Sequence, residues 1–186
     1  KNKDDKFHRS YNEKNWRILP RQAVHDSSSV TYPVFTAIAA PEVQNKLNGD
    51  FAIIAGPYLQ NLATGGCELD YTLTFVSEKF ISMVFFGVLD EGEKEIFAKI
   101  PLNIDVQTGA QLALGDVLNL RDADLLPVLR LLTKKDKVDF SKGIPESWYY
   151  NGTNFVFCQR SETGEWLEAT VAEKKKKKFL LKPELF

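Results

Sequence analysis

The stretch over residues 69–106 restricts the fold of this chain more than any other part of the sequence. In residues 69–75 apolar side chains alternate with polar ones, and residues 96–106 repeat this alternation. A period of two is typical of a β-strand with one face in water. Residues 80–89 lie between them and are apolar in both phases, which predicts a strand with both faces covered. Together the three segments predict an antiparallel meander.

Helical periodicity appears on both sides of this meander. Pro41 suits the first turn of a helix, and apolar residues follow it at steps of three and four until Gly56 and Pro57, which we expect to kink or end the helix. Asp124 is a candidate N-cap for a second helix with an apolar stripe at i, i+3, i+4 and i+7. A terminal helix is expected through Leu181.

Further strands are expected over residues 30–36 and 166–171, and Asn151 followed by Gly152 predicts a hairpin between two apolar runs. Because strands and helices come in runs and do not strictly alternate, the class is α+β. We therefore predict an α+β fold: an antiparallel meander sheet packed by one long N-terminal helix and shorter C-terminal helices.

The same patterns predict how the chain is divided. Residues 1–29 are polar and charged, and we expect an N-terminal arm with one edge strand at 15–19. Residues 30–186 are expected to form a single domain, with a first half over about 30–120 and a second half over about 121–186.

Composition excludes two classes of function. The formal net charge is −1 over 186 residues, whereas nucleic-acid-binding domains usually carry a strong basic excess. The apolar stretches are shorter than the roughly 18 residues of a membrane helix, so we expect a soluble chain. The chain starts at Lys1 and its only methionine is Met83. We therefore expect that an upstream signal peptide, membrane anchor or tag is missing.

The residues that usually carry chemistry are sparse. Cys67 and Cys158 belong to no C-x-x-C pair and lie near no histidine, so we expect no metal site and no cofactor. Two alternatives stay open for them: a disulfide, which implies an oxidising compartment, or two buried free thiols. His25, Asp26 and Ser27 are adjacent residues and indicate a polar loop, not a catalytic triad. We expect no catalytic residues.

Two clusters are candidates for binding. The rings of Trp148, Tyr149 and Tyr150 are the ligand-binding candidates, because aromatic rings stack on sugars and anchor interfaces. Alternation along a strand sends at least one ring inward, either Tyr149 or its two neighbours together. The lysine run 174–178 could seek anions, but five lysines sweep the circumference of a helix, and we expect them to project into solvent.

Short motifs in this order resemble those of the PdaC/RsiV-like domain family. The resemblance covers roughly residue 30 to the end and rests on the following residues: Tyr32, Pro33, Ile81, Ser82, Asn103, Ile104, Asp105, Thr108, Gly109, Leu112, Leu114, Asp116, Ile144, Pro145, Glu146, Ser147, Trp148, Tyr149, Tyr150, Asn151 and Gly152. Domains of that family lie outside the bacterial membrane, beside a peptidoglycan deacetylase domain or as the lysozyme-capturing part of an anti-sigma factor. The chain departs from the family at 159–165, which lacks the usual proline, tyrosine and glycine loop.

The resemblance implies an extracytoplasmic recognition domain, and because the sequence also lacks a catalytic constellation, we expect this domain to be non-enzymatic. Its expected partner is a cell-wall glycan or a secreted protein such as a lysozyme, with no nucleic acid and with membrane contact only through a missing upstream anchor. Two alternatives remain: an accessory module of a peptidoglycan-modifying enzyme, and a wall-polymer hydrolase whose dispersed carboxylates meet only in space.

Overall fold

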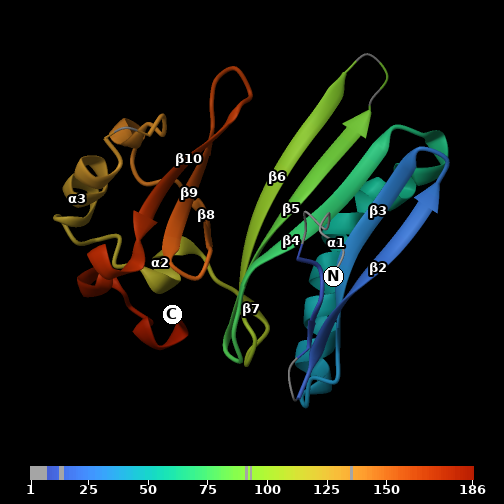
Figure 1. Ribbon diagram of the computed structural model, residues 1–186, viewed down its shortest axis with the longest axis horizontal. Helices are drawn as coiled ribbons and strands as arrows, with labels where there is room; N and C mark the ends of the chain where they lie inside the picture. Colours follow the sequence, from blue (N-terminus) through green and yellow to red (C-terminus); the bar gives the residue numbers. More distant parts are fainter. Residues whose placement is uncertain (1–7, 13–14, 91, 93, 135) are drawn as a thin grey trace.

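The computed structural model describes residues 8–12, 15–90, 92, 94–134 and 136–186, which build two β-sheets (Figure 1). The large sheet keeps its strands in sequence order: β1 (Tyr11–Asn12), β2 (Arg17–His25), β3 (Ser28–Thr36), β4 (Cys67–Val76), β5 (Phe80–Asp90), β6 (Glu95–Asp105) and β7 (Ala110–Gln111). The small sheet has the order β10 (Trp166–Ala172), β9 (Asn154–Arg160), β8 (Ser147–Tyr150). All neighbouring strands are antiparallel except the short β3–β4 pair.

The predicted α+β class and the predicted meander are confirmed. Strands β4, β5 and β6 pair in succession, and β5 runs through the middle of the large sheet. Its side chains are buried on both faces from Phe80 to Phe85, as their apolar character in both phases predicted. The predicted hairpin at Asn151 joins β8 to β9.

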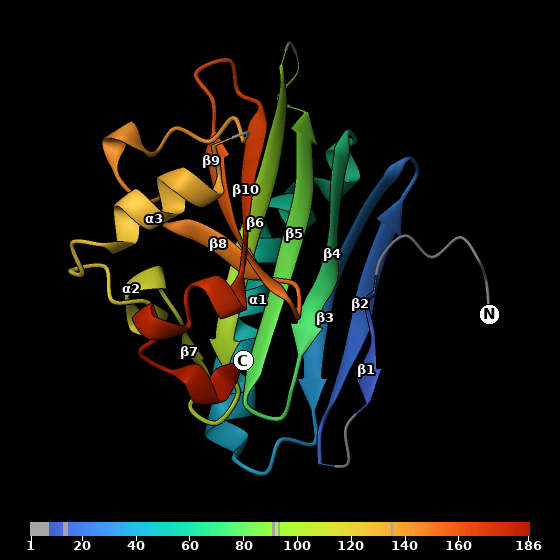
Figure 2. The same cartoon turned by 60° about the vertical axis from the view of Figure 1, so that its left-hand side comes forward.

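Helix α1 (Pro41–Asn61) covers one face of the large sheet (Figure 2). The buried residues of α1 recur at helical spacing: Val43, Leu47, Phe51, Ala55 and Tyr58. Phe51 packs between Phe35 of β3 and Phe85 of β5, with ring centroids 5.7 and 6.3 Å away. This main helix begins at Pro41, as predicted, but it follows three strands, so the description of it as a long N-terminal helix was wrong.

The helix also passes through Pro57, where a kink or an end was predicted. Proline removes one backbone donor, which leaves the carbonyl of Ile53 without its helical partner. Ile53 has an exposed side chain, so water reaches that side of the helix. The remaining helices are short, namely α2 (Leu114–Val117), α3 (Leu125–Leu132), η1 (Leu62–Thr64) and η2 (Phe140–Lys142). Among the described residues, no helix combines the length and the apolar character needed to cross a membrane.

The N-terminal region takes part in the large sheet. Strand β2 extends well past the strand expected at 15–19 and pairs with the whole of β3. Trp16 and Ile18 are buried in the same core as α1. The carbonyl oxygen of His8 accepts a hydrogen bond from the backbone N–H of Leu73, 2.7 Å away. Residues 8–10 therefore lie beside β4.

The C-terminal segment forms three 3₁₀ turns, η3 (Glu173–Lys175), η4 (Lys177–Phe179) and η5 (Pro183–Leu185), so the predicted terminal helix was wrong. Its backbone hydrogen bonds join residues three apart, from Lys176 N–H to Glu173 and from Phe179 N–H to Lys176. With three residues per turn, Lys176 and Phe179 lie on the same side of the chain. Phe179 belongs to the core, and Lys176 is buried with it.

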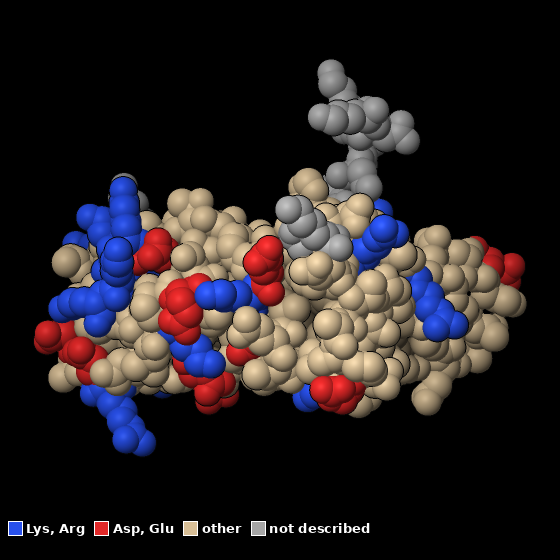
Figure 3. Space-filling model, turned by 90° about the horizontal axis from the view of Figure 1, so that it is seen from below, with Lys and Arg blue, Asp and Glu red and all other residues tan. Residues whose placement is uncertain are grey.

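Lys176 contradicts the expectation that the whole lysine run projects into solvent. Its Nζ donates a hydrogen bond to the carbonyl oxygen of Val171 at 3.0 Å and lies 3.8 Å from the centroid of the Phe155 ring. Burial lowers the pKa of Lys176 to about 7, while the nearby Glu173 opposes this shift. The other four lysines of the run are exposed. Seen from below, basic side chains gather at the end of the molecule that carries the C-terminal segment (Figure 3).

A buried polar network joins the two sheets, and we call it the Ser82–Asn103 bridge. Ser82 Oγ donates to Asn103 Oδ1 at 2.7 Å, and both side chains are buried on the large sheet. Asn103 Nδ2 donates to the carbonyl oxygen of Trp148 at 2.7 Å, and the backbone N–H of Tyr150 donates to Ser82 Oγ at 2.8 Å. The side chains of Ser82 and Asn103 thus form the hydrogen bonds that a neighbouring strand would otherwise form with the backbone of β8.

Replacing Ser82 by alanine is expected to lower the free energy of unfolding by about 2–4 kcal/mol, because it leaves the N–H of Tyr150 and Oδ1 of Asn103 buried without partners. Urea unfolding followed by tryptophan fluorescence measures the change. Ser27→Ala, at an exposed turn position, is the control and is expected to stay within about 0.5 kcal/mol of the wild type. Equal stability of the two variants would contradict the role of the bridge.

Lys176 predicts a stability that rises with pH. The unfolded lysine holds its proton up to the ordinary pKa of 10.5, whereas the folded one loses it near 7. Between these values the unfolded state binds more protons, so the free energy of unfolding increases by up to about 1.4 kcal/mol per pH unit. Below about pH 7 both states are charged and this dependence vanishes.

Urea unfolding of wild type and Lys176→Met from pH 6 to about 9.5 tests this prediction, since the difference between the two proteins cancels the contributions of other groups. The free energy of unfolding of the wild type minus that of Lys176→Met is expected to increase as the pH rises. Lys177→Met removes an exposed lysine of the same run and is expected to keep the wild-type slope. A Lys176→Met profile parallel to that of the wild type would show that the buried amine does not titrate in this window.

Candidate functional site

Beyond the Ser82–Asn103 bridge the two sheets separate, and a cavity of about 280 Å³ opens between them. We call it the inter-sheet groove. Strands β4, β5 and β6 form one wall and β10 contributes to the other, and the following residues line it: Glu68, Asp70, Phe86, Gly87, Val88, Phe97, Ala98, Lys99 and Trp166. Most of these residues stand on the face of the large sheet opposite α1, since they alternate with the residues that α1 buries. The groove is lined mainly by apolar side chains.

An ion pair closes the inner end of the groove. Lys99 Nζ of β6 pairs with Glu168 Oε1 of β10, which joins the two walls. The ammonium also lies 5.7 Å from the centroids of the Phe86 and Tyr149 rings. Tyr149 Oη donates to the Glu168 carboxylate at 3.3 Å, and burial, reinforced by the charge of Glu168, raises the pKa of Tyr149. The lysine and the carboxylate are therefore held by each other and by aromatic rings.

The two cysteines are free, buried thiols on different sheets, which is the second of the two alternatives that the sequence left open. Cys67 Sγ donates to the carbonyl oxygen of Tyr58 at 3.3 Å. Cys158 lies 4.0 Å from Glu168, and burial together with that carboxylate raises its pKa to about 12. A thiol with this pKa stays protonated at neutral pH, so it is a poor nucleophile and a poor metal ligand.

Two aromatic residues make the groove a candidate binding site. Phe97 keeps 53% of its surface exposed although it stands on a strand. Across from β6, the indole Nε1 of Trp166 is buried without a hydrogen-bond partner among the described residues. The guanidinium of Arg160 lies 6.0 Å from the centroid of the Trp166 ring. A ligand that supplied an acceptor to Nε1 would remove the cost of that unpaired donor.

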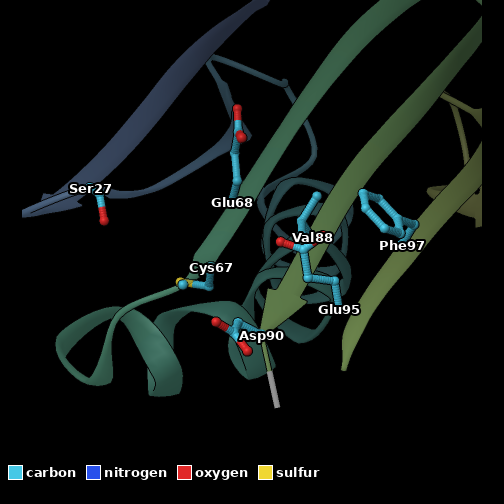
Figure 4. Close-up of a pocket in the computed structure, with 8 residues that line it drawn as sticks. Ser27, Cys67, Glu68, Val88, Asp90, Glu95 and Phe97 are labelled. Atoms are coloured by element: carbon cyan, nitrogen blue, oxygen red, sulfur yellow. The ribbon is translucent and has the colours of Figure 1, made fainter. Parts of the chain in front are cut away.

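Carboxylates surround the outer end of the groove. A second cavity of about 300 Å³ shares Glu68, Val88 and Phe97 with it, and Figure 4 shows the carboxylates of Glu68, Asp90 and Glu95 around this space. All three are exposed, and none forms an ion pair with another described residue. Within the described part of the chain, no three metal-ligating side chains come close enough to hold an ion.

Two of the three predicted ligand-binding rings belong to the core. Trp148 stacks on Phe155 and Phe80, with centroids 5.5 and 6.3 Å away, and Tyr150 is buried beside it. Neither offers a ring face to a ligand, because alternation along β8 points both to the apolar side of the small sheet. Tyr149 faces the other way and supports the inner end of the groove through Glu168.

The other polar candidates occupy exposed positions. His25 and Asp26 stand 3.5 Å apart at the turn between β2 and β3, which agrees with the predicted polar loop. His8 lies beside Thr72, whose hydroxyl accepts its backbone N–H at 3.2 Å. Neither imidazole lines the inter-sheet groove or the cavity next to it.

Sequence reasoning missed Phe97, Lys99, Trp166 and Glu168, although one signal was present. In the alternating run of β6, Ile96 and Ala98 carry the apolar phase, and Phe97 falls in the phase expected to face water. A large aromatic side chain at a position expected to face water is usually covered by another part of the protein or by a ligand. The remaining three positions carry no comparable signal.

Comparisons with known proteins identify the fold. No protein-family model matches the sequence, and no curated protein matches it. A solved structure of a member of the DUF3298 family from Bacteroides fragilis NCTC 9343 matches with a TM-score of 0.62 and 12% identity over 93% of this chain and 95% of that chain. A DUF3298 family protein from Pseudomonas aeruginosa PAO1 matches with a TM-score of 0.59 and 14% identity over 94% and 97%. The chain thus has the fold of solved proteins from a family of unknown function.

Proposed function

We propose that this chain is a non-enzymatic, extracytoplasmic recognition domain that binds a cell-wall component or a secreted protein such as a lysozyme in the inter-sheet groove. The class of partner and the location come from the sequence motifs that resemble the PdaC/RsiV-like domain. The observation that carries the proposal is the pair formed by exposed Phe97 and the unpartnered indole N–H of Trp166. Exposed aromatic rings at a cavity are typical anchors for sugars and for protein side chains.

The charges inside the groove favour binding over catalysis. Glu168 is paired with Lys99, and Asp70 accepts hydrogen bonds from the guanidinium of Arg9, including one of 2.8 Å from Nε. Both carboxylates therefore already have a cationic partner, which joins elements of the chain on either side of it. In the proposed domain these pairs keep the walls in place, and the aromatic rings contact the ligand.

Titration of the protein with soluble peptidoglycan fragments and, separately, with a secreted lysozyme tests the proposal by calorimetry. Saturable binding is expected in one of the two series. Phe97→Ala is expected to weaken that binding about tenfold or more, since an interface anchor contributes about 1.4 kcal/mol or more. Ile53→Ala is the matched control, because Ile53 is also exposed and lies on α1, on the opposite face of the large sheet.

Two outcomes would contradict the proposed function. The first is the absence of binding in both series at concentrations where the folded protein is stable. The second is binding that Phe97→Ala and Ile53→Ala leave equally unchanged, which would place the ligand outside the groove. Circular dichroism of each variant verifies that the fold is retained.

A further inference from the structure

Strand β6 has a free edge along the groove. One side of β6 pairs with β5 over its full length, from Glu95 to Asp105. On the other side β7 pairs only with Ile104 and Asp105, and no other described strand pairs with β6. Figures 1 and 2 both show this margin of the large sheet next to the small sheet. The free edge therefore borders the groove.

Every second residue of β6 points its backbone N–H and C=O groups away from β5, towards the free edge. Asn103 accepts the N–H of Leu112 at 2.8 Å, so the carbonyl of Asn103 points away from β5. Along an antiparallel strand every second residue points its N–H and C=O in the same direction, and β6 has no register shift against β5. Glu95, Phe97 and Lys99 share the phase of Asn103, and no backbone hydrogen bond with a described residue occupies that side of them.

Pro101 sets the limit of this edge. It also shares the phase of Asn103, but proline has no N–H to donate. An added strand can thus form regular hydrogen bonds only from Lys99 towards Glu95. Side chains of these same residues lie on the groove face of the sheet, where Phe97 and Lys99 line the groove. An added strand would place every second side chain next to Phe97 and Trp166.

The charged residues around the edge indicate which charge an added strand should carry. Glu68, Asp90 and Glu95 are exposed and lack ion-pair partners among the described residues, while the charge of Lys99 is neutralised by Glu168. These three carboxylates outnumber the exposed Lys94 beside Glu95 and the exposed Arg160 beside Trp166, so the charge around the edge is negative on balance and attracts lysine or arginine side chains. A second copy of this chain would bring its own three carboxylates to the same place, which disfavours pairing of two β6 edges.

We propose that the free edge of β6, from Glu95 to Lys99, accepts an extended basic segment of a partner protein as an additional strand. Main-chain hydrogen bonds to β6 hold the segment, and the groove receives its alternate side chains. The inference rests on the proposed function, since it names which partner the groove recognises: a secreted protein with an exposed, extended, cationic segment.

A synthetic peptide of about eight residues in which lysine alternates with valine serves as the probe, and the same peptide with glutamate in place of lysine is the control. NMR-detected hydrogen exchange of the uniformly labelled protein reports on the edge. At saturation with the lysine peptide, exchange of the Phe97 and Lys99 amides is expected to slow about tenfold or more, because their N–H groups become hydrogen bonded. The glutamate peptide is expected to leave both amides unchanged.

Two variants separate the backbone contribution from the charge. Phe97→Pro removes one edge N–H and is expected to abolish peptide binding, whereas Phe97→Ala keeps that N–H and is expected to retain more binding than Phe97→Pro. Glu95→Lys keeps the backbone and is expected to weaken the lysine peptide about threefold to tenfold at low salt. If Phe97→Pro fails to fold, hydrogen exchange of the wild type and peptide binding by Glu95→Lys still show whether the lysine peptide binds at the edge of β6.

Unchanged exchange at Phe97 and Lys99 with saturating lysine peptide would overturn the inference, and so would equal binding of the glutamate peptide. Concentration-dependent dimerisation that protects the same amides would also overturn it, because the edge would then belong to a second copy. If peptidoglycan fragments bind in a manner that depends on Phe97 while the lysine peptide does not bind, the recognition function stands and only the strand-addition inference fails.

Discussion

The way the two sheets pack together depends on the hydrogen bonds that Ser82 and Asn103 form with the backbone at the edge of β8. Two sheets that meet face to face normally bury apolar side chains, and a polar pair at such a position is costly unless all its hydrogen bonds are formed. In the Ser82–Asn103 bridge these hydrogen bonds are formed, because the two side chains bond to each other and to the backbone of Trp148 and Tyr150. The bridge fixes the position where the sheets meet, and so it fixes where they begin to separate.

Both walls of the groove are supported from behind. On the far side of the large sheet, Tyr58 of α1 packs against Gly87, where a Cβ atom would lie 1.9 Å from the tyrosine hydroxyl. Only glycine permits this approach, so α1 presses directly behind the groove-lining part of β5. Trp148 and Phe155 stack behind the small sheet in the same way. The groove is thus the space between two separately packed layers, joined by Lys99 and Glu168.

Local patterns predicted most of the fold, because strand alternation, the spacing of α1 and the turn at Asn151 each depend on neighbouring residues. The site was not predictable in this way. Lys99 and Glu168 are 69 positions apart, and their meeting depends on how two sheets pack. Lys176 was misjudged for a related reason: the lysine run forms 3₁₀ turns, and Phe179, three residues on, draws that side of the chain into the core.

An exposed strand edge also invites association between identical chains, and β6 carries two features that oppose it. Pro101 interrupts the row of donors, and the carboxylates of Glu95 and Glu68 repel the same groups on another copy. These charges repel only a like surface, and they attract a cationic one. In the binding mode that we propose, the same carboxylates would therefore both oppose pairing between identical edges and favour a cationic strand from another protein.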